Sequence, residues 1–206
     1  MQEEKESTRV EAFSDGIFAI AITLLVLSIK VPSHESVVQS GLAHALVLLW
    51  PAYLAFFISF ITILVIWVQH HIMFIYVRRV YHPLLYWNGL LLLVVTFVPF
   101  PTGLLAEHLS HADAKLAANM YTGNLLAISV VFYWLWRHIS RMGITILENS
   151  INSKFSELER VTRYTKIAPL LYLCAFGISF YSEFAGIFIC IFIAFLLSTK
   201  GWPVRK

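Results

Sequence analysis

The sequence is poor in charged residues, which make up only 13% of its 206 residues, while hydrophobic residues make up 59%. A soluble domain of this size carries about a quarter charged residues and could not bury so much apolar surface in one core. The shortage of charge therefore excludes a large soluble domain. The net charge of +3 is small and the basic residues form no patch of their own, so nucleic acid is not expected as a partner.

Cysteine and catalytic motifs are scarce as well. Cys174 and Cys190 both lie in apolar runs, so no disulfide framework is expected. The sequence contains no glycine-rich phosphate loop, no Ser/His/Asp set and no paired carboxylates, and we expect neither an enzyme nor a cofactor. His70 and His71 are adjacent, so on a helix they would point about 100° apart and could not hold one metal ion together. No linker divides the chain, which predicts a single domain over residues 1–206.

Long apolar runs are what the sequence has in abundance. A bilayer core about 30 Å thick needs roughly 20 apolar residues in a helix. The segments that meet or approach this length are 10–31, 48–74, 84–106, 115–136, 167–181 and 184–198. Pro51, in the second segment, either starts the spanning helix or kinks it. The last two segments are short and separated by only two residues, which predicts a tight helical hairpin.

Basic residues predict how these segments are oriented. With the N-terminus inside, thirteen of the 15 lysines and arginines lie on the inner side, and only Lys30 and Lys115 lie outside. Cytoplasmic segments are enriched in lysine and arginine, so both termini are expected in the cytoplasm. The polar stretch 138–166 is interpreted as a cytoplasmic connection, either a helical hairpin or a segment lying on the membrane surface. The predicted fold class is an all-α membrane protein with six transmembrane helices, N-in and C-in.

The first apolar segment contains a carboxylate, Asp15. The pattern TRVE, from Thr8 to Glu11, fits a capping box and predicts a helix that begins near Arg9. Asp15 would then lie in the first turns, where the helix dipole favours negative charge. Arg9 lies six residues earlier and about 120° around the helix, so a partner on another helix is favoured. The roles open to Asp15 are locking helices together, ion binding and proton carriage, and the first is preferred.

One face of this helix is almost wholly apolar. On a helical wheel the residues within about 60° of Ile20 are Phe13, Gly16, Ile17, Leu24 and Leu27, with Thr23 at the edge. Asp15 and Ser14 lie about 140° and 120° away, on opposite sides of the wheel. An aliphatic stripe of this kind occurs in lipid-facing and core packing as well as in pores, so periodicity alone leaves these alternatives open.

The motif R-x-x-x-F-S-D resembles the opening helix of the transmembrane protein 175 family, the lysosomal potassium channels of animals and their bacterial relatives. The matching residues are Arg9, Phe13, Ser14 and Asp15, followed by GIFAIAITLLVL. WVQHH at 67–71 and WNGLLLLVVTFVPFP at 87–101 resemble the next two helices. Bacterial members have one six-helix repeat and form homotetramers. The resemblance therefore implies a homotetramer in a bacterial plasma membrane, with other copies of the chain, the lipid bilayer and K⁺ as its partners.

The resemblance also implies residue roles, because in this family the first helices of four subunits line the pore. It implies a narrowest point at Ile20, with Leu24 and Leu27 one and two turns outward. Thr23 matches the family's pore threonine. The motif residues on this helix are implied to bond with polar side chains of the next two helices, and the candidates are Trp67, His70, His71 and Asn88. Which histidine takes part stays open.

The function expected on this basis is a potassium-permeable channel with an apolar constriction. The sequence has no TVGYG filter, and stacked aliphatic rings would gate by dewetting and favour K⁺ over Na⁺. A secondary transporter or uniporter is the alternative; no carboxylate occurs at mid-depth, which argues against proton coupling but not against uniport. An intramembrane enzyme is a third possibility and would have to use Asp15, His70, His71 or Asn88.

Overall fold

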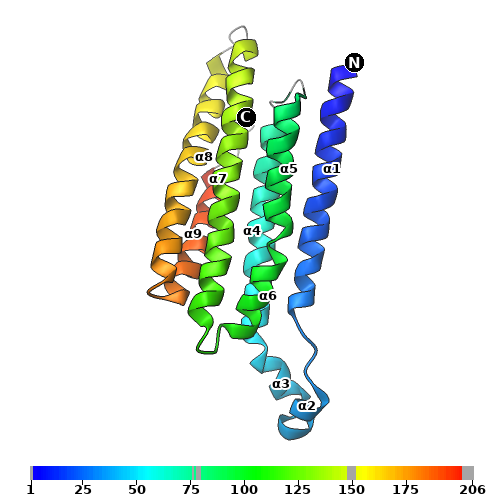
Figure 1. Ribbon diagram of the computed structural model, residues 1–206, viewed down its shortest axis with the longest axis vertical. Coiled ribbons are helices and arrows are strands. Elements are labelled where there is room, and N and C mark those ends of the chain that lie inside the picture. The colour runs from blue at the N-terminus through cyan, green and yellow to red at the C-terminus, as the bar shows by residue number, and fades with distance from the viewer. Residues whose placement is uncertain (1, 76, 78–79, 148–151, 201–206) are drawn as a thin grey trace.

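The computed structural model describes residues 2–75, 77, 80–147 and 152–200, and all the regular secondary structure among them is helical (Figure 1). Side chains are described for 7–75, 77, 80–141, 159 and 161–198. Within this part of the chain, 4 segments are long and apolar enough to cross a membrane: Ser7–Ser28, Trp50–Phe74, His82–His108 and Ala114–Arg141. A shorter apolar helix covers Glu183–Ser198. A count of six spanning helices stays a prediction.

Helix α1 (Gln2–Leu24) begins well before Arg9. The capping-box interpretation is therefore wrong: TRVE lies inside the helix, which starts in a QEEKE stretch of strong helix formers. Asp15 lies about three and a half turns from the start, beyond the reach of the terminal dipole. The expectation that the helix end stabilises the Asp15 carboxylate is wrong for the same reason.

The far end of α1 is also shorter than predicted. The α-helix gives way to a 3₁₀ turn, η1 (Leu25–Ser28), and Ile29 is extended, so helix does not continue to Val31. Two short helices follow, α2 (His34–Ser40) and α3 (Leu42–Leu48). Gly41 separates them with φ 80°, a backbone conformation that glycine adopts without steric cost. Figure 1 shows this pair extending beyond the rest of the bundle.

Prolines set the boundaries of the next three helices. Pro51 lies in the first turn of α4 (Trp50–Phe74), so it starts this helix and does not kink it. The predicted segment 84–106 is two helices, α5 (His82–Thr96) and α6 (Pro99–His108). They separate where Pro99 and Pro101 lack the N–H groups that would continue the α5 ladder.

The last three helices are longer than their apolar cores. They are α7 (Ala114–Leu147), α8 (Asn152–Ser179) and α9 (Glu183–Lys200). Helix therefore covers both ends of the polar stretch 138–166, which favours a helical hairpin over a surface-lying segment. The tight hairpin predicted for the last two segments is confirmed. At that turn a Cβ on Gly186 would lie 2.6 Å from the Cβ of Ser179, so only glycine lets α8 and α9 approach this closely.

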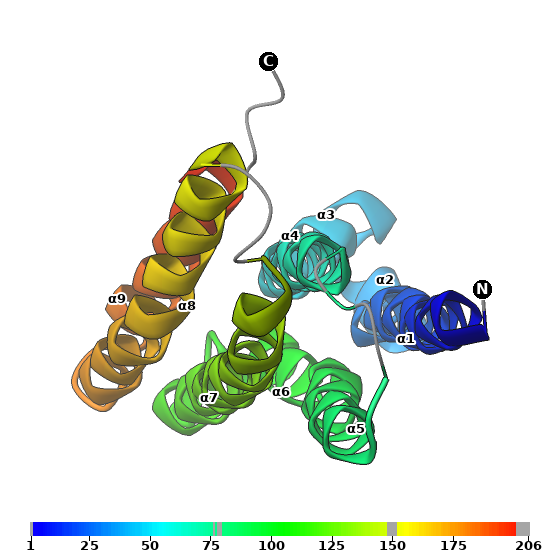
Figure 2. The ribbon, with the colours of Figure 1, turned by 90° about the horizontal axis from the view of Figure 1, so that it is seen from above.

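Helix α7 is central in the bundle, and α1 lies at its edge. α7 packs on α5, α6, α8 and α9, while α1 packs on α4, α5 and α6 (Figure 2). In the apolar core of α1, 22% of the residues are buried, against 39% or 50% in the other candidate spans. α1 begins at the end of the bundle where α7 ends and α8 begins (Figure 1). Which end faces the cytoplasm stays a prediction; Arg78, Arg79, Arg205 and Lys206, on which it partly rested, lie outside the described residues.

Candidate functional site

A chain of buried hydrogen bonds joins α1, α4 and α5. The amide Nδ2 of Asn88 donates to Oγ of Ser14 at 2.9 Å, and Ser14 donates its own proton to the carbonyl of Val10 at 2.9 Å. Asn88 Oδ1 lies 2.9 Å from Nε2 of His70. Ser14 and His70 are fully buried and Asn88 is nearly so. Each helix thus supplies one buried polar side chain whose partner lies on a neighbouring helix.

The direction of these hydrogen bonds determines which nitrogen of His70 carries a proton. Because the Asn88 amide points its N–H at Ser14, its oxygen is the atom that faces His70, and Nε2 of His70 must donate to it. Nδ1 of His70 has no hydrogen-bond partner among the described residues. The ring instead packs against Phe18 and Phe74, with centroids 5.3 and 4.4 Å away. Replacing Asn88 by an apolar residue would therefore leave His70 with no polar partner on either nitrogen.

Asp15 bonds to α4 beside this chain. The indole Nε1 of Trp67 donates to Oδ1 of Asp15 at 2.8 Å, so the partner of the carboxylate lies on another helix, as the wheel argument predicted. His71, stacked on Trp67, pairs through Nδ1 with Glu11 at 2.7 Å. The two adjacent histidines thus differ in environment: His70 is buried with Asn88, and His71 is more exposed and joined to Glu11.

Two residues of the R-x-x-x-F-S-D motif stand apart from these bonds. Phe13 is 65% exposed, and Arg9 is also exposed and has no hydrogen bond or ion pair to any described residue. Both line a groove of about 660 Å³ between α1 and α5 that reaches Asn88. Within this chain the structure brings Ser14 and Asp15 to their partners and leaves Arg9 and Phe13 on the surface.

The aliphatic stripe of α1, continued by Leu27 of η1, faces away from the rest of the bundle. Ile20 is 57% exposed, Leu24 39% and Leu27 70%. Thr23 is exposed as well, and its hydroxyl donates to the carbonyl of Ile20 at 2.9 Å. The opposite face of the helix carries Ser14, Phe18, Ala21 and Leu25, all buried. α1 is therefore held by one face and presents the other.

Sequence reasoning missed Glu11 as a bonding residue, because it assigned Glu11 to a helix cap. The spacing did contain a signal, since Glu11 lies four residues before Asp15 and so near the same face of the helix. Sequence reasoning also gave no partners for several hydroxyl groups that form hydrogen bonds between helices in the structure. Ser59 of α4 bonds to Thr102 of α6 at 2.8 Å, and Ser179 of α8 bonds to Asn119 of α7 at 2.6 Å. These bonds join α4 to α6 and α7 to α8, in the way that the bonds of Asn88 join α1 to its neighbours.

Apolar helices of membrane-spanning length, fastened to one another by buried polar side chains, define a multi-pass α-helical membrane protein. A sequence model described as "Endosomal/lysosomal potassium channel TMEM175" matches residues 9–99. A protein of Chamaesiphon minutus named as a potassium channel is 48% identical over 199 residues, which cover 97% of each chain. The chain therefore belongs to the TMEM175 family.

Two further similarities agree with this assignment. A protein of Streptomyces collinus, also named as a potassium channel, is 50% identical over 139 residues, 67% of this chain and 66% of that one. The crystal structure of a lysosomal potassium-selective channel TMEM175 homolog from Chamaesiphon minutus superimposes with a TM-score of 0.88 at 47% identity. The superimposed region covers 97% of this chain and 100% of the homolog's chain.

Proposed function

We propose that the chain is a potassium-permeable cation channel, assembled as a homotetramer in which the α1 helices of four subunits line a central pore. Two relatives that share about half of its residues are named as potassium channels. The single observation that carries the pore assignment is the outward aliphatic face of α1, with Ile20 57% and Leu27 70% exposed on the least buried of the candidate spans.

The hydrogen bonds of α1 to its neighbours fix the direction in which this aliphatic face points. Ser14 and Asp15 are tied to Asn88 and Trp67, so α1 cannot rotate about its own axis without breaking both bonds. The fastened side faces α4 and α5, and the aliphatic side must then face outward. We assign Ser14, Asp15, Trp67, His70 and Asn88 to this positioning role, with His71 holding Glu11 beside them.

The proposed conduction mechanism is hydrophobic gating. Four copies of Ile20, with Leu24 and Leu27 further out, would form stacked apolar rings that dewet when narrow and pass partly hydrated cations when wider. K⁺ would be preferred over Na⁺ because it sheds water more readily. Thr23 uses its proton on the Ile20 carbonyl, so the lone pairs of its oxygen are what it can offer to a passing cation. We place both termini in the cytoplasm of a bacterial cell.

Recording purified channel in planar bilayers under asymmetric K⁺ and Na⁺ tests the proposal. Ile20→Asn should raise conductance and reduce the preference for K⁺, because a ring of amides stays wet. Ile191→Asn is the matched control: Ile191 is a partly exposed isoleucine of α9, at the opposite side of the subunit from α1 (Figure 2).

The control should leave conductance and selectivity unchanged. Currents and selectivity that Ile20→Asn does not alter would remove Ile20 from the constriction. Flux that requires a second solute would favour the secondary transporter.

A further inference from the structure

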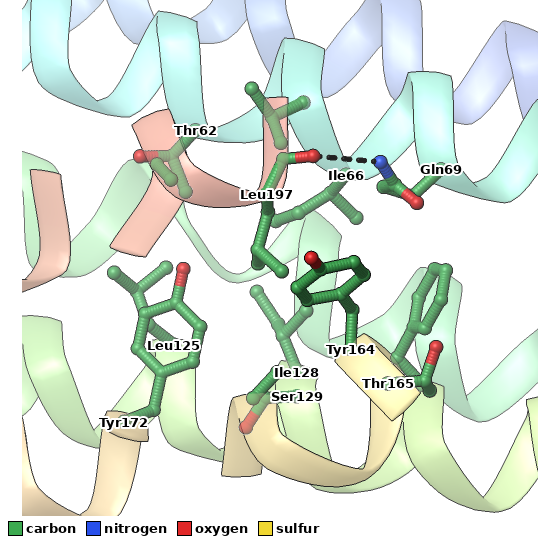
Figure 3. A pocket seen from close by; sticks show the side chains of 14 residues that line it. Thr62, Ile66, Gln69, Leu125, Ile128, Ser129, Tyr164, Thr165, Tyr172 and Leu197 are labelled. Atoms are coloured by element: carbon green, nitrogen blue, oxygen red, sulfur yellow. Dashed lines mark hydrogen bonds between the residues drawn. The ribbon is translucent and has the colours of Figure 1, made fainter. Parts of the chain in front are cut away.

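A cavity of about 60 Å³, partly open to the surface, lies between α4, α7, α8 and α9 (Figure 3). It is lined by a face of α4 that carries Thr62, Ile66 and Gln69, and not by the face that bonds to α1. From α8 it receives Tyr164 and Tyr172. The cavity is therefore separate from the site that holds the pore helix.

Three polar groups point into this cavity with bonding capacity unused. Tyr172 is only 6% exposed, and none of the hydrogen bonds found between the described residues involves its hydroxyl. Figure 3 shows this hydroxyl pointing from α8 toward Thr62 on α4, and the Tyr164 hydroxyl pointing toward Leu197. The amide Nε2 of Gln69 donates to the carbonyl of Leu197 at 3.2 Å, and no hydrogen bond from a described residue reaches its amide oxygen. A buried hydroxyl without a partner is costly, so such groups are normally satisfied by water or a ligand.

The lining of the cavity extends along α8. Tyr164 and Tyr172 are eight residues apart on α8, which separates them by about 12 Å along the helix. The volume corresponds to roughly four to six water-sized spheres, each needing about 10–15 Å³. An unbranched chain fits these dimensions, whereas a fused-ring molecule does not.

The lining also restricts the charge of the ligand. Among the described residues that enclose the cavity there is no charged side chain, and most are aliphatic or aromatic. A carboxylate or phosphate would be buried there without a counter-ion, at a cost that a few hydroxyls do not offset. The ligand must therefore be uncharged, with a group that can accept or donate one hydrogen bond.

We propose that this cavity binds a linear, uncharged amphiphile of the long-chain alcohol class, taken up from the bilayer. Its hydroxyl bonds to Tyr172, and its alkyl chain lies between Ile66 of α4 and Ile128 of α7, toward Tyr164 and Gln69. The proposed site is independent of the proposed pore along α1, and the experiment that tests it measures only ligand binding.

The probe is a photoreactive octanol that carries a diazirine, applied to the purified full chain in nanodiscs, with the labelled residues mapped by mass spectrometry. We expect saturable labelling within residues 125–132 or 164–172, competed by 1-octanol and not by octanoate. Tyr172→Phe keeps the ring and removes the hydroxyl, so the apparent affinity should fall about fivefold, the effect of one neutral hydrogen bond. Tyr181→Phe, at an exposed position of the α8–α9 turn, is the control and should bind as the unchanged chain does.

Three results would overturn the proposal. They are labelling that does not saturate or falls only on lipid-facing residues, equal competition by octanoate, and unaltered affinity in Tyr172→Phe. Should Tyr172→Phe fail to fold, Ala168→Leu fills the cavity from α8 and should abolish the labelling; labelling that persists in this variant rejects the site. A cavity occupied by water alone would give no labelling within it, which also rejects the proposal.

Discussion

Replacing Asn88 by leucine should destabilise the folded chain more than any other removal of a single buried amide. Leucine has the same branched shape as asparagine and the same number of side-chain heavy atoms, so the change removes polarity without leaving a void. It breaks two bonds at once: the 2.9 Å bond to Ser14 and the 2.9 Å bond to His70. Ser14 and His70 are 0% exposed, so water does not reach the two groups that lose their partner.

The expected magnitude follows from what each neighbour loses. His70 already has no partner on Nδ1, so losing the Nε2 bond leaves a fully buried imidazole with no hydrogen bond, at about 1–3 kcal/mol. Ser14 keeps its bond to the Val10 carbonyl and loses only a donor to its oxygen, for which about 0.6 kcal/mol is typical between membrane helices. Together these losses predict a fall in the free energy of unfolding of about 2–4 kcal/mol.

Reversible unfolding in mixed micelles, titrated with a denaturing detergent, measures this difference. Asn124→Leu is the matched control, because Asn124 is also buried and its Nδ2 has no partner in the described part of the chain. The control should cost nothing or stabilise slightly. If the two substitutions shift the unfolding free energy equally, the bonds of Asn88 contribute no more than general burial, and the argument for a fastened α1 fails.

Two further substitutions test contacts elsewhere. Trp67→Phe removes the only described donor to Asp15, so it should lower the free energy of unfolding by about 1.5–3 kcal/mol and loosen the assembly of subunits, as measured by size-exclusion chromatography in detergent. Trp50→Phe, at an exposed position, should do neither. An unchanged assembly in Trp67→Phe would argue against a positioning role for Asp15. Gly186→Ala places a Cβ 2.6 Å from that of Ser179 and should lower the free energy of unfolding by about 1–3 kcal/mol, while Gly177→Ala, with nothing within 4 Å, should be neutral or stabilising. Equal melting temperatures for the two alanine variants would contradict the close approach of α8 and α9.

The helix boundaries show where local sequence signals failed. Thr8 and Glu11 have the spacing of a capping box, but the residues before them are equally good helix formers, so nothing stops the helix there. Pro99 and Pro101 were a signal that the predicted segment 84–106 did not use: they divide a run that hydrophobicity alone reads as continuous. The length of the apolar segment 167–181 also underestimated the length of α8, because a helix that leaves the apolar layer continues with polar residues.

The sequence alone determined that the chain is helical and apolar enough for a membrane, that α1 has one aliphatic face, and that Asp15 needs a partner on another helix. These properties follow from composition and from the 3.6-residue period, which a single helix possesses before it packs. Only the tertiary structure decided that His70 takes Asn88 while His71 takes Glu11, and that Tyr172 is left facing a cavity. Such pairings depend on the depth and rotation at which separate helices meet, and no pattern within one helix specifies either.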